Sequence, residues 1–282
     1  PLATRLMTTR TIVVIVADAL ADVVTDRMWQ WGVHAVSEAS IGHGESEIAT
    51  SVGNDGTAIA RALATLDPSW RWEVRDVDDA VAQVAPEHLA PTWYAPGRVS
   101  VPAALLPFDP GDDDPLVTVI DPGSAFGLGD HPTTRTSMAL LAELIDHPEP
   151  TASVLDVGCG TGALAILAAQ LGVDRVRAVD IADAAVEATR HNMELNGVVG
   201  AVDVDTTPVA ALEGEYDIVV ANILAPALIA MANDLRLLVR PGGALIISGI
   251  LADRHDHVLE ALHPLTPAES LTLEGWVSIV LR

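Results

Sequence analysis

Three glycines after a short, mostly apolar segment are the part of this sequence best suited to chemistry. Val154–Val157 reads as a buried strand, and Gly158, Gly160 and Gly162 follow it in a G-x-G-x-G pattern. Glycine permits a sharp turn and lets the backbone approach a ligand with no side chain between them. Asp180 ends the next predicted strand, where a carboxylate can hold the two hydroxyls of a ribose. These residues predict a site for a ligand that carries a ribose.

The combination resembles the S-adenosylmethionine-dependent methyltransferases. Its glycine spacing differs from the G-x-G-x-x-G of dinucleotide-binding enzymes, and one acid, Asp156, precedes the glycines. The resemblance implies S-adenosylmethionine as the cofactor. We expect no metal ion, because His255 and His257 have neither an H-E-x-x-H pattern nor a cysteine pair with them.

Two further segments are expected at the same edge of the sheet. Asn222 ends the fourth predicted strand, and Ala125–Thr134 precedes the first helix of this part of the chain. In parallel α/β sheets, ligands bind beyond the carboxyl ends of the strands, where the strand order reverses. We therefore expect Asn222 and this loop to meet the glycine turn and Asp180.

Longer strings make the resemblance more specific. Six of them resemble the PrmA family, the methyltransferases of ribosomal protein L11: Asp121–Gly127, His131–Thr134, Asn222–Ala225, Pro241–Gly243, Ser248–Ala252 and Glu274–Trp276. The likeness is close over residues 119–282. It implies that S-adenosylmethionine is bound by Thr134, Gly158, Gly160, Asp180 and Asn222, with Asn222 also the catalytic residue. It further implies methyl transfer to protein amines, namely lysine side chains and the N-terminal amine.

Departures from the family pattern leave other functions open. Leu128 and Asp130 stand where the family's loop has threonines, and the connector retains only Trp93 and Tyr94 of the usual aromatic and basic residues. One alternative is a methyltransferase of the same fold that acts on another protein or on a small-molecule amine. A second is a non-catalytic module that binds RNA or a ligand, which the absence of lysine and the few arginines of residues 11–77 argue against.

Four residues each allow two interpretations. His131 precedes a proline, so it either caps a turn or acts as a general base. Cys159 is either a small packing residue or a nucleophile. Asp203 or Asp205 either binds the amine of an adenine or simply ends a strand.

The pattern of elements divides the chain. Residues 11–77 alternate as strand, helix, strand, strand, helix and strand, which is the ferredoxin-like plan. Seven of the 18 prolines then fall between Pro86 and Pro115, which favours an extended connector. We predict a ferredoxin-like substrate-recognition domain at 8–84, a proline-rich linker at 85–118 and a methyltransferase domain at 119–282.

The last of these ranges alternates strands with helices and ends in a hairpin, which predicts an α/β fold with a Rossmann-like sheet of seven strands. The expected strands are 153–157, 175–180, 201–205, 216–221 and 244–248, with the hairpin at 265–273 and 275–281. The expected helices are 134–145, 163–171, 182–196, 226–239 and 253–262.

Composition restricts the partners. The 282 residues carry 39 acids and 15 bases, all arginine, for a net charge of −24. Such a surface repels phosphate backbones, so we expect no direct binding of nucleic acid. It would also attract a basic protein, but a GC-rich or salt-adapted source is the simpler explanation of the acidity and of the missing lysine. The protein substrate, ribosomal protein L11, is what the resemblance implies. There is no apolar run of membrane-spanning length and no secretory leader pattern, and the single cysteine fits a reducing compartment. We expect a cytoplasmic monomer.

Overall fold

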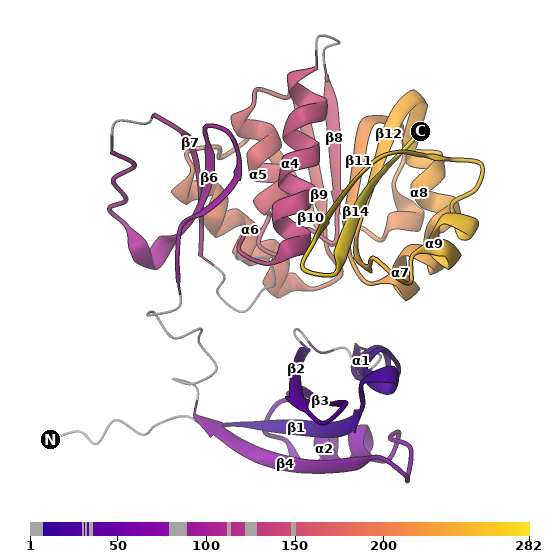
Figure 1. Cartoon of the computed structure of the whole chain (residues 1–282). Coiled ribbons are helices and arrows are strands. Elements are labelled where there is room, and N and C mark those ends of the chain that lie inside the picture. Colours follow the sequence, from indigo (N-terminus) through magenta and orange to yellow (C-terminus); the bar gives the residue numbers. More distant parts are fainter. Residues whose placement is uncertain are drawn as a thin grey trace, which may run out of the picture. The chain divides into compact units, whose positions relative to one another are not determined.

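The computed structural model describes residues 8–29, 31, 33, 36–78, 89–111, 114–121, 129–147 and 151–282. The chain divides into two compact units, Pro1–Leu89 and Ala90–Arg282, and each is described by itself (Figure 1). Within the described ranges, none of the helices combines the length and the apolar character needed to cross a membrane.

In its described residues, the smaller unit contains a four-stranded antiparallel sheet and the helices α1 and α2. Its strands lie in the order β2-β3-β1-β4. Alternate residues of β1, such as Ile12, Val14 and Val16, enter a core shared with both helices because successive strand residues point to opposite faces. The order of elements is the one expected, and the ferredoxin-like assignment stays a prediction. The elements are β1 (Thr8–Ala17), η1 (Asp18–Leu20), α1 (Ala21–Trp29), β2 (Ser37–Gly42), β3 (Glu45–Thr50), α2 (Gly56–Leu63) and β4 (Arg71–Asp78).

The larger unit contains the predicted sheet of seven strands, in the order β10-β9-β8-β11-β12-β14-β13. The first five strands in this order run parallel, and β14 returns antiparallel to β12. The α/β class and the mainly parallel sheet are therefore confirmed. The strands are β8 (Ser153–Val157), β9 (Arg175–Val179), β10 (Val202–Asp205), β11 (Tyr216–Asn222), β12 (Val239–Leu251), β13 (Pro267–Leu273) and β14 (Trp276–Leu281).

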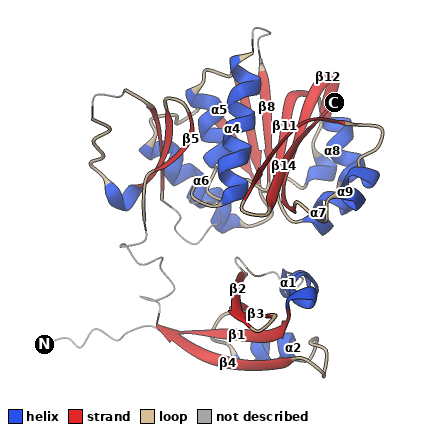
Figure 2. Cartoon of the chain, viewed as in Figure 1, coloured by secondary structure: helices blue, strands red, loops and turns tan. Residues whose placement is uncertain are grey.

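Helices cover both faces of this sheet (Figure 2). Successive strand residues join opposite cores: Val154 packs with α4, α5 and α6, and Leu155 packs with α7, α8 and α9. The helix expected at 226–239 is two helices, which meet at Met231. The helices are α4 (Pro132–Asp146), α5 (Ala163–Gln170), α6 (Asp183–Leu195), α7 (Ala225–Ala230), α8 (Ala232–Leu238) and α9 (Asp256–Ala261), with one 3-10 turn, η4 (Val209–Ala211).

The predicted proline-rich linker contains regular structure. A second sheet of three strands consists of β5 (Thr92–Ala95), β6 (Arg98–Pro102) and β7 (Leu116–Ile120), with the 3-10 turn η3 (Ala103–Leu105) after β6. The prolines do not prevent it because they flank β5 or end β6, where a missing N–H interrupts no ladder of hydrogen bonds. The structure thus differs from the expected extended connector over residues 92–102, while residues 79–88 lie outside the described ranges.

Candidate functional site

The register of the sheet brings three predicted site residues to one edge. Val157 pairs with Val179 on one side and with Ala221 on the other. The next residues along these three strands, Gly158, Asp180 and Asn222, therefore stand at the same level. The strand order reverses between β8 and β11, which is where ligands bind in such sheets.

The glycine turn has a conformation that side chains would disrupt. Gly158, Gly160 and Gly162 have φ values of +73°, +54° and +79°, in the left-handed region that favours glycine. A Cβ at position 158 would lie 2.4 Å from Cγ2 of Ile223, and one at position 162 would lie 2.6 Å from Cγ2 of Thr189. The turn thus packs closely between the segment after β11 and helix α6, and its three glycines leave no room for a Cβ at positions 158 and 162.

Asp180 links the glycine turn to helix α6. One of its carboxylate oxygens accepts the Gly160 N–H at 3.0 Å and the other accepts the Ala182 N–H at 3.0 Å. Each oxygen retains acceptor capacity, so this half-buried carboxylate can also take hydroxyl donors from a ligand. Its neighbour Ile181 is 92% exposed, an apolar surface beside the carboxylate that a flat ring could cover.

Asp156 is a buried carboxyl beneath the same turn. Its Oδ2 accepts the Ala165 N–H at 3.2 Å, and its Oδ1 has no hydrogen-bond partner among the described residues. Burial, with a further contribution from the charge of Asp180, raises the pKa of Asp156 to about 7.

The start of helix α4 lies at the same edge. The hydroxyl of Ser248, which pairs with Asn222 in the sheet, donates to the Thr133 carbonyl at 3.4 Å. His131 caps the helix, since its ring accepts the Thr133 N–H, and its ring lies edge-on to Trp276 with centroids 5.3 Å apart. Burial lowers the pKa of His131. Of the two interpretations of His131, the structure therefore supports the capping role.

Thr134 supplies a second unpartnered polar atom. The residue is 2% exposed, and its hydroxyl makes no hydrogen bond within the described part of the chain. A buried polar group without a partner costs about 1–3 kcal/mol, so a ligand that satisfies it gains that energy. The Thr134 hydroxyl, the Asp180 carboxylate and the glycine backbone suit S-adenosylmethionine, which has ribose hydroxyls and an amino acid group. Among the described residues, no three His, Cys, Asp or Glu side chains cluster as metal ligands.

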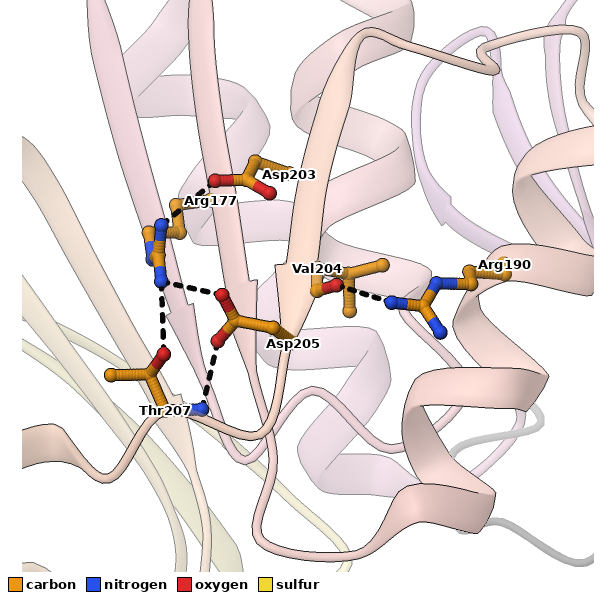
Figure 3. A network of polar contacts seen from close by, with 6 residues as sticks. All are labelled: Arg177, Arg190, Asp203, Val204, Asp205 and Thr207. Carbon is orange, nitrogen blue, oxygen red and sulfur yellow. Dashed lines mark hydrogen bonds and ion pairs between the residues drawn. The ribbon is translucent and has the colours of Figure 1, made fainter.

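Other candidates have structural partners. Arg177 forms ion pairs with both Asp203 and Asp205, each with an N–O distance of 2.7 Å (Figure 3). Hydrogen bonding from Thr207, together with the charge of Arg177, lowers the pKa of Asp205. These contacts fit the interpretation of both acids as strand-end residues. Cys159 is buried, and burial raises the pKa of its thiol, which fits a packing role.

Two contacts of the glycine turn could not be read from the sequence patterns. On helix α6, the Thr189 hydroxyl donates to the Gly160 carbonyl at 3.1 Å and the Asn192 amide donates to the Thr161 carbonyl at 2.9 Å. In the sequence, the one indication of these contacts is the spacing of three residues, which places both polar side chains on the same face of the helix. Asp130 is exposed, and residues 122–128, which include Leu128, lie outside the described ranges.

Comparisons with known proteins agree with this geometry. The family model described as ribosomal protein L11 methyltransferase (PrmA) matches residues 75–282. Curated relatives named ribosomal protein L11 methyltransferase are 41% identical over 198 residues in Pelobacter propionicus and 44% identical over 197 residues in Geobacter metallireducens. These matches cover 69% of this chain. The chain spans 60% of the length of the first relative and 63% of the second.

A solved structure is similar to about two thirds of this chain. It is a crystal structure of a ribosomal protein L11 methylase from Lactobacillus delbrueckii subsp. bulgaricus, with a TM-score of 0.62 and 29% sequence identity. The match covers 68% of this chain and 97% of that one.

Proposed function

Because the chain belongs to the PrmA family, described as ribosomal protein L11 methyltransferase, we propose that it transfers the methyl group of S-adenosylmethionine to an amine of ribosomal protein L11. The observation that carries the proposal is the register that aligns Gly158, Asp180 and Asn222 at the point where strand order reverses. The names of the relatives support the substrate. We place the reaction in the cytoplasm.

We assign the cofactor contacts as follows. Asp180 accepts the ribose hydroxyls, because its two oxygens retain lone pairs after binding the turn. We place the backbone at Gly158 and Gly160 against the cofactor, because glycine allows the backbone to approach a ligand closely. The Thr134 hydroxyl, which lacks a partner among the described residues, binds a polar group of the cofactor.

The cofactor supplies a methyl group that is already activated by its attachment to a sulfonium. The protein must therefore align an amine with that carbon, keep the amine neutral and exclude water. Alignment and removal of water can together lower a barrier by several kcal/mol. Entry into a pocket lowers the pKa of an amine, because burial disfavours the ammonium form.

Asn222 is our catalytic residue. It is half-buried at the end of β11, on the strand next to β8 and at the same level as Gly158. Its side-chain carbonyl, or a backbone carbonyl beside it, can accept an N–H of the amine and so direct the lone pair at the methyl carbon. A neutral amide suits this role because, unlike a carboxylate, it does not hold the amine in its charged form. Lysine side chains and the N-terminal amine both meet these requirements.

The test is methyl transfer from labelled S-adenosylmethionine to purified ribosomal protein L11, with mass spectrometry to locate the modified amines. For Asn222→Ala, we expect methylation to fall about 100-fold, because the amine loses its alignment, while calorimetry shows a smaller loss of cofactor affinity. Asn233→Ala is the control: Asn233 lies on α8 and hydrogen bonds only to Arg236 among its described partners. It should behave like the wild type.

Each other outcome supports a different function. Cofactor binding without label in ribosomal protein L11, but with label in another protein or a small amine, would favour a methyltransferase of the same fold with a different substrate. Absence of cofactor binding in the folded wild type would contradict the enzyme assignment and favour a binding module.

A further inference from the structure

One face of helix α6, continued by its C-cap Asn196, carries three polar side chains that hydrogen bond to backbone groups of other segments. Thr189, Asn192 and Asn196 are spaced by three and four residues, which places them on the same face. The first two are fully buried, in a position where apolar residues are the norm. Buried amides are retained when they make specific hydrogen bonds.

The side chains of Asn192 and Asn196 bind the backbone of β7 and of the residue after it, as a neighbouring strand would. β7 pairs with β6 along one edge. Along its other edge, Asn196 accepts the Val119 N–H at 2.8 Å and donates to the Val119 carbonyl at 2.7 Å. Asn192 does the same for Asp121, accepting its N–H at 2.8 Å and donating to its carbonyl at 2.9 Å. The spacing between Val119 and Asp121 is that of alternate residues on a strand, so the amides continue the hydrogen-bond pattern of the sheet.

Asn192 differs from Asn196 in one respect. Its amide also donates to the Thr161 carbonyl at 2.9 Å, inside the glycine turn. The second donation of Asn196 goes instead to the Asn192 carbonyl, within α6 itself. One side chain thus holds both the end of β7 and the turn that we assign to the cofactor.

We infer that Asn192 is a positioning residue for the methyl transfer: it fixes the glycine turn against the end of β7, so that the turn is preorganised for S-adenosylmethionine. The inference rests on the proposed function. Its physical basis is that glycine can adopt many backbone conformations, so a turn with three glycines keeps a single arrangement only when hydrogen bonds fix it. Hydrogen bonds from Thr189 to the Gly160 carbonyl and from Asn192 to the Thr161 carbonyl provide that support.

Aspartate substitutions test this with a matched control. Asn192→Asp and Asn196→Asp keep the side-chain volume and the acceptor oxygen. Each replaces the amide nitrogen that donates to two carbonyls with an oxygen, which cannot donate to them. Both variants should lose thermal stability, Asn192→Asp the more because Asn192 is fully buried and Asn196 half-buried, and only Asn192→Asp removes a contact to the turn.

We expect calorimetry to show S-adenosylmethionine bound about tenfold more weakly by Asn192→Asp, since leaving the turn carbonyl without its donor costs roughly one factor of ten in affinity. The KM for the cofactor should rise in parallel, with a smaller change in kcat at saturating cofactor. Asn196→Asp should bind the cofactor as the wild type does.

Equal cofactor affinity in the two aspartate variants would overturn the inference, because the contact to Thr161 would then have no role in binding. If either aspartate variant does not fold, Asn192→Ala and Asn196→Ala give the same comparison. A wild-type protein that fails to bind S-adenosylmethionine would instead refute the proposed function, so the two failures are distinguishable.

Discussion

At the scale of single residues, two carboxyls under the glycine turn have opposite environments. Asp180 is half-buried, and each of its two oxygens accepts a backbone N–H. Asp156 is fully buried, and only one of its oxygens has a partner among the described residues. Burial disfavours its charge, and the nearby charge of Asp180 adds to the effect. The two acids therefore differ in what they contribute: Asp180 accepts, while Asp156 can hold a proton near neutral pH.

The raised pKa of Asp156 predicts a dependence of stability on pH. In the unfolded chain an aspartate loses its proton near pH 4, while in the folded protein the pKa is about 7. Between these values the folded state holds a proton that the unfolded state has lost, so this group's contribution to stability falls as pH rises and levels off above pH 7. Asp156→Asn, which cannot titrate, should remove this dependence.

Urea unfolding of the wild type and of Asp156→Asn at pH 5 and at pH 8 measures it. The difference in unfolding free energy between the two proteins should shift on the order of 2 kcal/mol in favour of the variant at the higher pH. A difference that is the same at both pH values would contradict the assigned titration.

The sequence was sufficient to predict which site residues lie together when those residues directly follow strands. Gly158, Asp180 and Asn222 each come after a segment with a clear strand pattern, so parallel pairing alone places them together. Thr189 and Asn192 could not be assigned in this way. They act through carbonyls 29 and 31 residues away, and no local pattern shows which backbone a helix will meet.

At the scale of elements, the turn between β8 and α5 depends on α6. Gly162 begins α5 in a left-handed conformation, and its missing side chain leaves the room that Thr189 occupies. Gly172, after the same helix, also has a positive φ of +83°, but a Cβ there would meet nothing within 4 Å. Substitutions at the two positions therefore separate two costs: the left-handed conformation, which both share, and the steric clash of an added Cβ, which only Gly162 has.

We predict that Gly172→Ala costs about 1 kcal/mol, from the left-handed conformation alone, and leaves cofactor binding unchanged. Gly162→Ala should cost more than about 3 kcal/mol, because the added Cβ collides with a fully buried side chain. It should also weaken binding of S-adenosylmethionine. Urea unfolding and calorimetry give both quantities.

A second substitution checks the cause. Thr189→Ser removes the methyl group that meets the added Cβ and keeps the hydroxyl that binds Gly160. It should recover part of the stability lost in Gly162→Ala. No recovery would mean that the collision with Thr189 is not the source of the loss.

Most elements of the large sheet were predictable, whereas β5 and β6 were not. The former are rich in β-branched and apolar residues and stand between helical segments, as does Ser153–Val157, which the sequence predicted with its observed bounds. The strands β5 and β6 are four and five residues long and lie among prolines. Their stability comes from burial in the tertiary structure, as the complete burial of Val99 and Val101 shows, and local propensity does not report it.

At the scale of the whole molecule, the division into two units changes where the chain should be cut. The sequence suggested a methyltransferase domain from residue 119, a boundary that would fall inside β7. The compact unit begins instead at Ala90 and includes β5, β6 and β7. Cutting at 119 would remove β5, β6 and Leu116–Thr118 of β7, and so leave the remainder of β7 without the strand with which it pairs.

Two fragments test the division of labour between the units. Residues 90–282 should fold and bind S-adenosylmethionine within about threefold of the full chain, because a compact unit with its own core can fold alone and contains every residue assigned to the cofactor. Residues 121–282 should be much less stable, since without β7 the Asn196 amide loses its contacts with Val119, and α4, α5 and α6 lose the strands that pack against them. Thermal unfolding and calorimetry of both fragments check these expectations.

We further expect residues 90–282 to bind the cofactor yet fail to methylate ribosomal protein L11, because the smaller unit is our proposed substrate-recognition domain. Methylation of the protein at the full-chain rate by residues 90–282 would refute that role, and a short peptide amine offered to both proteins controls for loss of chemistry.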